Sequence, residues 1–142
     1  MKLATFLLAG GLAAFPASAR AELDIRRSGR AWATIEDDGT VRVDGRSVGR
    51  IDPRGEVRVR GRAAGEVEPS GEIRKSGRVV GRVERDGTLR HQGRAVGSVE
   101  DDGTIRLDGR AWGSVRHCCG DFASKRTVAA ALAFFLDEFF GG

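Results

Sequence analysis

The sequence predicts an all-β protein in which tandem 16-residue β-hairpin repeats are arranged radially as a ring, with a C-terminal apolar helix or tail. Three observations support this prediction. Residues 25–120 divide, without insertion or deletion, into six copies of one 16-residue unit. Each copy carries glycines at turn spacing between apolar residues of strand type. Residues 121–142 then change to an Ala- and Phe-rich pattern with helical period.

The first 21 residues are expected to be a secretory signal peptide. A basic start at Lys2 precedes an apolar stretch from Leu3 to Phe15, and small residues follow. Cleavage after Ala19 or after Ala21 is equally compatible with the pattern. The chain is therefore expected to be exported, to be periplasmic, outer-envelope-associated or secreted, and to contain a repeat domain at 22–120 and a tail at 121–142.

The charge composition gives no reason to expect nucleic-acid binding. The whole chain has 24 basic and 20 acidic residues, and cleavage after Ala21 removes Lys2 and Arg20. A small positive excess spread over the remaining chain differs from the concentrated basic face of most nucleic-acid-binding proteins.

Two glycine positions within the repeat predict two kinds of turn. The fifth position is Gly in all six copies and follows a variable residue, which indicates a two-residue hairpin turn with positive φ. The fifteenth position is Gly in five copies, which indicates a three-residue turn that ends in a left-handed residue.

Turn length then predicts which residues face each other. The three-residue turn places the eleventh position opposite the first position of the next copy, and the two-residue turn places the first opposite the eighth. A bulge or bend at the small ninth position, Ala33 once and Gly otherwise, would reset the alternation. The expected core is therefore the first, eighth and eleventh positions: Ile25, Val41, Val57, Ile73, Leu89, Ile105; Trp32, Val48, Ala64, Val80, Val96, Trp112; Ile35, Ile51, Val67, Val83, Val99, Val115.

Trp occurs only at Trp32 in the first copy and Trp112 in the last, at the same repeat position. In a rod these residues would cap opposite ends, whereas in a closed ring they would meet at the seam. A ring also removes exposed sheet edges, so the ring is favoured.

The pattern G-R-x-V-G-x-V-E-x-D-G-x-h-R, where h is apolar, is clearest at Gly45 to Arg58, Gly77 to Arg90 and Gly93 to Arg106. It resembles the five-fold β-flower family of small exported bacterial proteins, whose hairpins radiate from a central axis and whose chains end in an Ala- and Phe-rich tail. The resemblance implies a β-flower-like ring and no mechanism. Five-fold and six-fold closure both remain open, because this chain has six copies by one turn and five by the other.

Arginine recurs at the second and sixth positions, while the twelfth is acidic in five copies. Radial symmetry would turn these residues into rings of Arg–carboxylate pairs or, where Arg is unpaired, into a surface for anionic glycans or lipid headgroups. The candidate anion-binding residues are Arg42, Arg46, Arg58, Arg62, Arg74, Arg78, Arg90, Arg94, Arg106 and Arg110.

Other sites receive little support from the sequence. In an oxidising compartment Cys118 and Cys119 can form a disulfide with each other or an intermolecular bridge. They can also remain thiols, act in redox chemistry, or bind metal together with His117. The acidic turns at 36–39 and 100–103 are better explained by turn chemistry than by calcium binding. No catalytic constellation, cofactor site or metal site is predicted.

The tail is expected to form a helix, with Ser124 as its cap, Gly141 at its end, and Val128, Leu132, Phe135 and Phe139 on one stripe. It can act as a plug over one open end of the core, or Phe134, Phe135, Phe139 and Phe140 can contact a membrane surface or a second copy. The first hypothesis for function is a non-catalytic scaffold or binding module. The alternative is a membrane-associated or self-assembling structural protein that acts through the Phe-rich tail.

Overall fold

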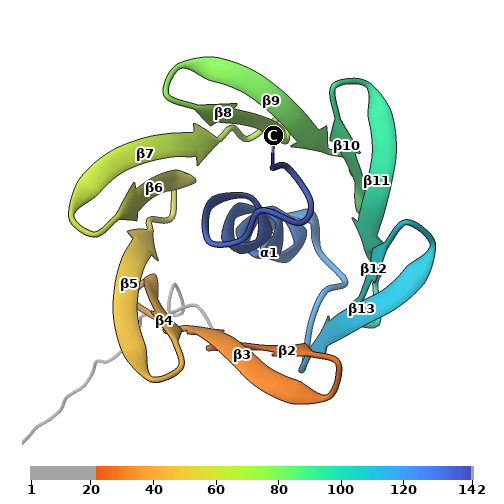
Figure 1. Ribbon diagram of the computed structural model, residues 1–142, viewed down its shortest axis with the longest axis horizontal. Helices are drawn as coiled ribbons and strands as arrows, with labels where there is room; N and C mark the ends of the chain where they lie inside the picture. The colour runs from red at the N-terminus through yellow and green to blue at the C-terminus, as the bar shows by residue number, and fades with distance from the viewer. Residues whose placement is uncertain (1–21, 142) are drawn as a thin grey trace, which may run out of the picture.

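The computed structural model describes residues 22–141, so the expected signal peptide and its cleavage sites lie outside the described residues. Twelve strands form a closed antiparallel barrel around one helix (Figure 1). The strands are β2 (Leu23–Arg27), β3 (Arg30–Ile35), β4 (Thr40–Val43), β5 (Arg46–Ile51), β6 (Glu56–Val59), β7 (Arg62–Val67), β8 (Glu72–Lys75), β9 (Arg78–Val83), β10 (Thr88–His91), β11 (Arg94–Val99), β12 (Thr104–Leu107) and β13 (Arg110–Val115), and the helix is α1 (Phe122–Phe134).

The ring closes with six hairpins, one from each copy of the repeat. The last strand, β13, pairs with the first, β2, through Val115 opposite Ile25. This pairing confirms the predicted ring and answers the open question of its symmetry in favour of six-fold closure. Trp32 and Trp112 meet edge to face at this seam, with ring centroids 5.7 Å apart.

The two-residue turns are confirmed in their backbone geometry. Both central residues of each turn have positive φ, for example Arg60 at 52° and Gly61 at 82°. This combination belongs to the type I′ turn that suits the twist of antiparallel strands. Because the strands alternate in direction, all six turns lie at one end of the ring, here named the tip end, and the longer turns lie at the opposite mouth end.

The register confirms one predicted pairing and corrects the other. The eleventh position does lie opposite the first of the next copy, as in Ile35 opposite Val41. The first position, however, lies opposite the ninth, as in Val41 opposite Gly49, and the eighth residue is the extra residue of a bulge. The predicted pairing of first and eighth positions was wrong because the alternation resets one residue earlier than expected.

The bulge also changes the core. All twelve residues at the first and eleventh positions are buried, as predicted. At the eighth position only Trp112 is buried, while Trp32, Val48, Ala64, Val80 and Val96 are half-buried. An unpaired bulge residue tilts out of the strand's regular alternation, so most of these side chains lie at the edge of the core.

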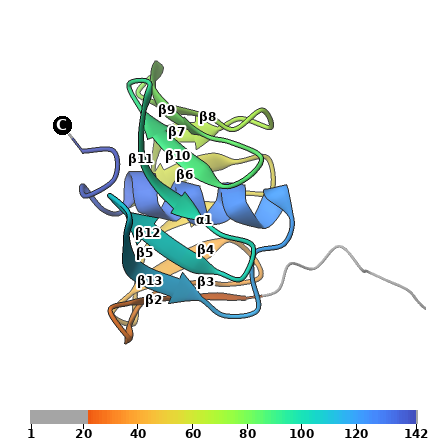
Figure 2. The same cartoon turned by 90° about the vertical axis from the view of Figure 1, so that its right-hand side faces the viewer.

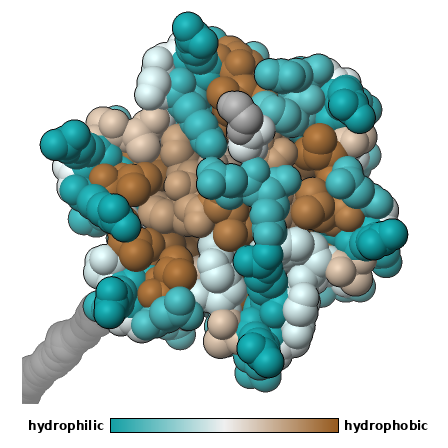
Figure 3. Space-filling model, in the orientation of Figure 1, coloured by the Kyte–Doolittle hydropathy of each residue, from teal (hydrophilic) through white to brown (hydrophobic). Residues whose placement is uncertain are grey.

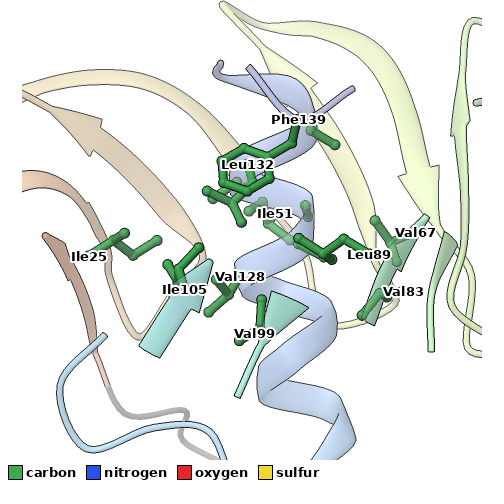
Figure 4. Close-up of a cluster of buried hydrophobic side chains, with 14 of the residues drawn as sticks. Ile25, Ile51, Val67, Val83, Leu89, Val99, Ile105, Val128, Leu132 and Phe139 are labelled. Carbon is green, nitrogen blue, oxygen red and sulfur yellow. The ribbon is translucent and has the colours of Figure 1, made fainter. Parts of the chain in front are cut away.

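Helix α1 passes along the inside of the ring (Figure 2). Its residues Val128 to Ala133 are buried against the branched side chains of the strands, as Figure 4 shows around Val128 and Leu132. Four of these six helical residues are Ala, which leaves room for the twelve strand side chains that already point inward. The tail is therefore a plug inside the ring, whereas the sequence suggested a cover over one end.

The helix boundaries differ from those expected. Asp121 is the N-cap, and its carboxylate accepts a hydrogen bond from the amide of Ser124 at 3.2 Å. The helix ends at Phe134, well before Gly141. Ser124 was a plausible cap, but Asp121 three residues earlier occupies the extended conformation that capping requires.

The four tail phenylalanines each lie over a ninth-position glycine, with Phe135 against Gly49, Phe134 against Gly65, Phe140 against Gly81, and Phe139 against Gly97. Phe139 and Phe140 are only 2% and 3% exposed, and Phe134 and Phe135 are half-buried. These contacts oppose the expectation that the rings face a membrane or a second copy. Within residues 22–141, no helix has the length and apolar character needed to cross a bilayer.

Candidate functional site

Four second-position arginines are held in ion pairs on the outer surface. Each donates from Nε to the twelfth-position Glu of the preceding copy: Arg42 to Glu36 at 2.7 Å, Arg74 to Glu68 at 2.7 Å, Arg90 to Glu84 at 2.9 Å and Arg106 to Glu100 at 2.8 Å. The hydrogen bond that Arg74 donates to Glu68 raises the pKa of Arg74. Exposed pairs of this kind add little stability, but they neutralise these arginines as anion ligands.

The sixth-position arginines do not converge on one site. Arg46, Arg62, Arg78, Arg94 and Arg110 each open the second strand of a hairpin and are exposed at its tip. Figure 3 shows the resulting surface, with hydrophilic residues at the ends of the radiating hairpins and hydrophobic residues between them. One guanidinium per hairpin gives a dispersed positive rim.

Arg58 differs from the four paired arginines because the carboxylate before it is shorter. The twelfth position of the preceding copy is Asp52, whose Oδ1 accepts hydrogen bonds from the amides of Arg54 and Glu56, both at 2.9 Å. Arg58 has no carboxylate within ion-pair distance in the described part of the chain, and its one side-chain bond goes to the carbonyl of Gly61 at 3.4 Å. It is exposed, whereas Arg42, Arg74, Arg90 and Arg106 are half-buried.

Two further arginines lie beside Arg58. Arg50 is directly opposite it across β5 and β6, a geometry that brings Cβ atoms to about 5 Å. Arg60 lies two residues along in the hairpin turn. The three line a groove of about 290 Å³ between the β4–β5 and β6–β7 hairpins, together with Thr40, Ser47, Val48, Gly49 and Gly61.

The other five junctions between neighbouring copies lack this combination. At each of these junctions at least one of the positions equivalent to Arg50, Arg58 and Arg60 holds a residue other than Arg. The equivalent residues are Thr34, Arg42 and Asp44 between copies one and two; Glu66, Arg74 and Ser76 between three and four; Arg82, Arg90 and Gln92 between four and five; Ser98, Arg106 and Asp108 between five and six; and Ser114, Arg26 and Ser28 between six and one. Only the junction of copies two and three combines three cations with a second-position Arg that is free of an acidic partner.

Carboxylates border the groove on its mouth side. A smaller cavity of about 220 Å³ is lined by Arg50, Asp52, Glu56 and Arg58. Asp52 is held by the two amides described above, and Glu56 is exposed. The arginine pair at positions 50 and 58 thus separates a purely cationic tip side from a mixed mouth side.

Sequence reasoning included Arg58 among ten equivalent arginines but missed Arg50 and Arg60. The signals were present: copy three alone has Arg at the fourth position, and copy two alone has Asp at the twelfth. They were missed because each repeat position was treated as symmetric, whereas the site arises where two copies depart from the repeat at the same junction.

A second cavity, of about 310 Å³, opens at the mouth end beside the start of α1. Arg126 on its wall donates to the carbonyls of Glu68 at 3.0 Å and Val67 at 2.9 Å, and burial lowers the pKa of Arg126. The carboxylates on its rim, Asp52 and Asp121, accept backbone amides. The bonds of Arg126 fasten the helix to the barrel wall, so the charged groups Arg126, Asp52 and Asp121 of this cavity have structural partners.

The cysteines and the acidic turns take structural roles. Cys118 and Cys119 are joined in a disulfide, and Cys119 is fully buried, with its amide donating to the carbonyl of Asp101 at 2.8 Å. Asp38, Asp86 and Asp102 each accept the amide two residues along, from Thr40, Thr88 and Thr104, and these bonds lower the pKa of each Asp. Among residues 22–141, no three His, Cys, Asp or Glu side chains gather as a metal site.

In comparisons with known proteins, no protein family, curated protein or solved structure matches the chain.

Proposed function

We propose that this protein is an exported, non-catalytic binding module whose groove between the β4–β5 and β6–β7 hairpins binds an anionic ligand. The observation that carries the proposal is the convergence of three arginines, Arg50, Arg58 and Arg60, at a junction where the second-position arginine has no carboxylate partner. No other junction among the described residues combines both features. Guanidinium groups form paired, charge-assisted hydrogen bonds with carboxylate, sulfate and phosphate groups.

The closed ring supports this role by fixing the groove before a ligand arrives. Arg50 and Arg58 extend from paired strands, and Arg60 lies in a two-residue turn. Each strand has a neighbour on both sides, so the backbone of the groove has no free sheet edge. A preformed site loses less conformational entropy on binding than a flexible one.

The proposal also includes export of the protein. This part rests on the signal-peptide pattern of residues 1–21. A binding module outside the cytoplasm meets anionic glycans and lipid headgroups, the ligand classes that an arginine groove suits. The β-flower resemblance agrees with this placement, because that family consists of small exported proteins.

The test is the binding of dextran sulfate to residues 22–142, measured by titration calorimetry in low and high salt, with neutral dextran as the control ligand. The double variant Arg58→Gln/Arg60→Asn should weaken binding by about tenfold or more. The charge-matched control Arg94→Gln/Arg110→Gln removes two exposed arginines from other hairpins and should have a much smaller effect. Equal losses in the two double variants would overturn the proposal, as would binding that is insensitive to salt.

A further inference from the structure

The groove has two chemically different ends. Toward the tip, Arg60 and the hydroxyl of Ser47 line it, and Thr40 lies beside Arg50 on β4. None of the residues that line the groove carries a carboxylate. Toward the mouth, Asp52 and Glu56 lie beside the same Arg50–Arg58 pair. An elongated ligand that places one anion over the three arginines therefore continues past two carboxylates.

The floor of the groove suits a sugar ring. Gly49 and Gly61 present bare backbone, Val48 offers a small half-buried apolar contact, and the hydroxyls of Thr40 and Ser47 can exchange hydrogen bonds with ligand hydroxyls. A volume of about 290 Å³ is at the lower limit for small-molecule sites, so the groove has room for one ring at a time.

The carboxylates act against a second nearby anion. Asp52 is fixed by its two backbone bonds, and Glu56 is exposed and outside ion-pair distance of any described cation. Both can accept hydrogen bonds from neutral sugar hydroxyls, whereas they repel a neighbouring carboxylate, sulfate or phosphate. Repulsion at the border of an attractive site is a common source of specificity.

We infer that the ligand is an acidic glycan in which each anionic sugar is flanked by an uncharged sugar, with the anionic group over Arg50, Arg58 and Arg60 and the uncharged neighbour beside Asp52 and Glu56. This inference rests on the proposed function and narrows it to one ligand class. Polymers that carry a charge on every unit are disfavoured, as are anionic membrane surfaces.

The experiment compares two sets of probes of similar length. Hyaluronate oligosaccharides alternate a uronate with a neutral N-acetyl sugar, whereas oligogalacturonate carries a uronate on every residue. The first should bind about threefold to tenfold more tightly, the range expected for one added like-charge contact near a protein surface. Polyphosphate and vesicles containing anionic phospholipid should bind more weakly than hyaluronate.

A charge-neutral variant tests the cause of the preference. Glu56→Gln should narrow the difference between the two uronate probes, mainly by strengthening the binding of oligogalacturonate. Asp108→Asn, which removes one exposed carboxylate from the tip of the β12–β13 hairpin, is the matched control and should leave the preference unchanged. Equal melting temperatures for the three proteins would exclude an effect through folding.

The outcomes separate this inference from the proposed function. If oligogalacturonate, polyphosphate or vesicles bind as tightly as hyaluronate, and Arg58→Gln/Arg60→Asn weakens that binding, the groove binds anions but the alternating glycan is wrong. If Glu56→Gln leaves the preference intact, the role of the carboxylate border is wrong. If no anionic probe binds more tightly than neutral dextran, both proposals fail.

Discussion

Arg60 adopts a backbone conformation that suits Gly or Asn better than a long side chain. Its φ is 52°, in the left-handed region, where residues other than Gly, Asn and Asp are uncommon. Arg60→Asn should therefore stabilise the protein by up to about 1 kcal/mol, because Asn is tolerated better at positive φ. The same substitution should weaken the binding of dextran sulfate, so stability and affinity are expected to change in opposite directions.

The control is Gln92→Asn, at the equivalent turn position of another copy, where φ is also 52°. Urea denaturation should show a similar gain in the free energy of unfolding, and calorimetry should show unchanged affinity. A loss of stability on Arg60→Asn would mean that the arginine has a packing role that the geometry does not show.

Gly49 is required for a reason different from that of the turn glycines. A Cβ at this position would lie 2.3 Å from the carbonyl oxygen of Arg58 and 2.7 Å from the ring of Phe135. Gly49→Ala should destabilise the protein by about 2–4 kcal/mol, since neither the paired strand nor the ring can withdraw freely. At Gly61 nothing lies within 4 Å and only the φ of 82° opposes a side chain, so Gly61→Ala should cost about 1 kcal/mol. Urea unfolding of both variants measures the difference, and equal losses would contradict this distinction.

The long turns at the mouth end should make stability sensitive to acid. Asp38, Asp86 and Asp102 accept threonine amides in the folded state, which lowers the pKa of each below its ordinary value of about 4. A depressed folded pKa means that the stabilisation is complete above the unfolded pKa and is lost as pH falls through the folded pKa. Stability should therefore decline below about pH 4.

The variant Asp38→Asn/Asp86→Asn/Asp102→Asn removes the three titrating groups but keeps an oxygen that accepts the amide. Near neutral pH the wild type should have a higher melting temperature than the variant. The difference between the two melting temperatures should shrink as the pH falls below about 4. A gap that stays constant with pH would show that these carboxylates do not contribute to the acid sensitivity.

At the level of elements, the repeat pattern was sufficient to predict both turns, the ring and the buried first and eleventh positions. It did not predict where the bulge begins, because Gly at the ninth position is compatible with a bulge on either side of it. The interior position of α1 was also beyond the pattern. An Ala-rich helix fits among twelve inward-pointing side chains only if the space inside the ring is large enough. That space depends on the diameter of the closed ring, which the repeat spacing alone does not give.

At the level of the whole molecule, near-perfect repetition makes each departure visible. The two Trp residues occur where the chain closes on itself, and Glu138 fastens the tail across that seam by accepting Trp112 Nε1 at 2.6 Å and pairing with Arg27. The disulfide occupies the last turn before the helix. These departures explain closure and plugging, whereas the one between copies two and three is not required for either. That departure is the basis for the proposal that the groove binds a ligand.

The repeat also allows the site to be copied elsewhere in the same molecule. At the junction of copies four and five, Arg82 lies opposite Arg90, as Arg50 lies opposite Arg58, but Arg90 is paired with Glu84 and the turn residue is Gln92. Glu84→Asp shortens the carboxylate that neutralises Arg90, and Gln92→Arg adds the third guanidinium.

The double variant should bind two short dextran sulfate oligosaccharides per chain where the wild type binds one, with salt dependence at both sites. Glu84→Asp alone, which leaves the third cation missing, should add only weak binding. Calorimetric stoichiometry distinguishes these results, and a double variant that still binds one oligosaccharide would show that three converging arginines are insufficient to make the site.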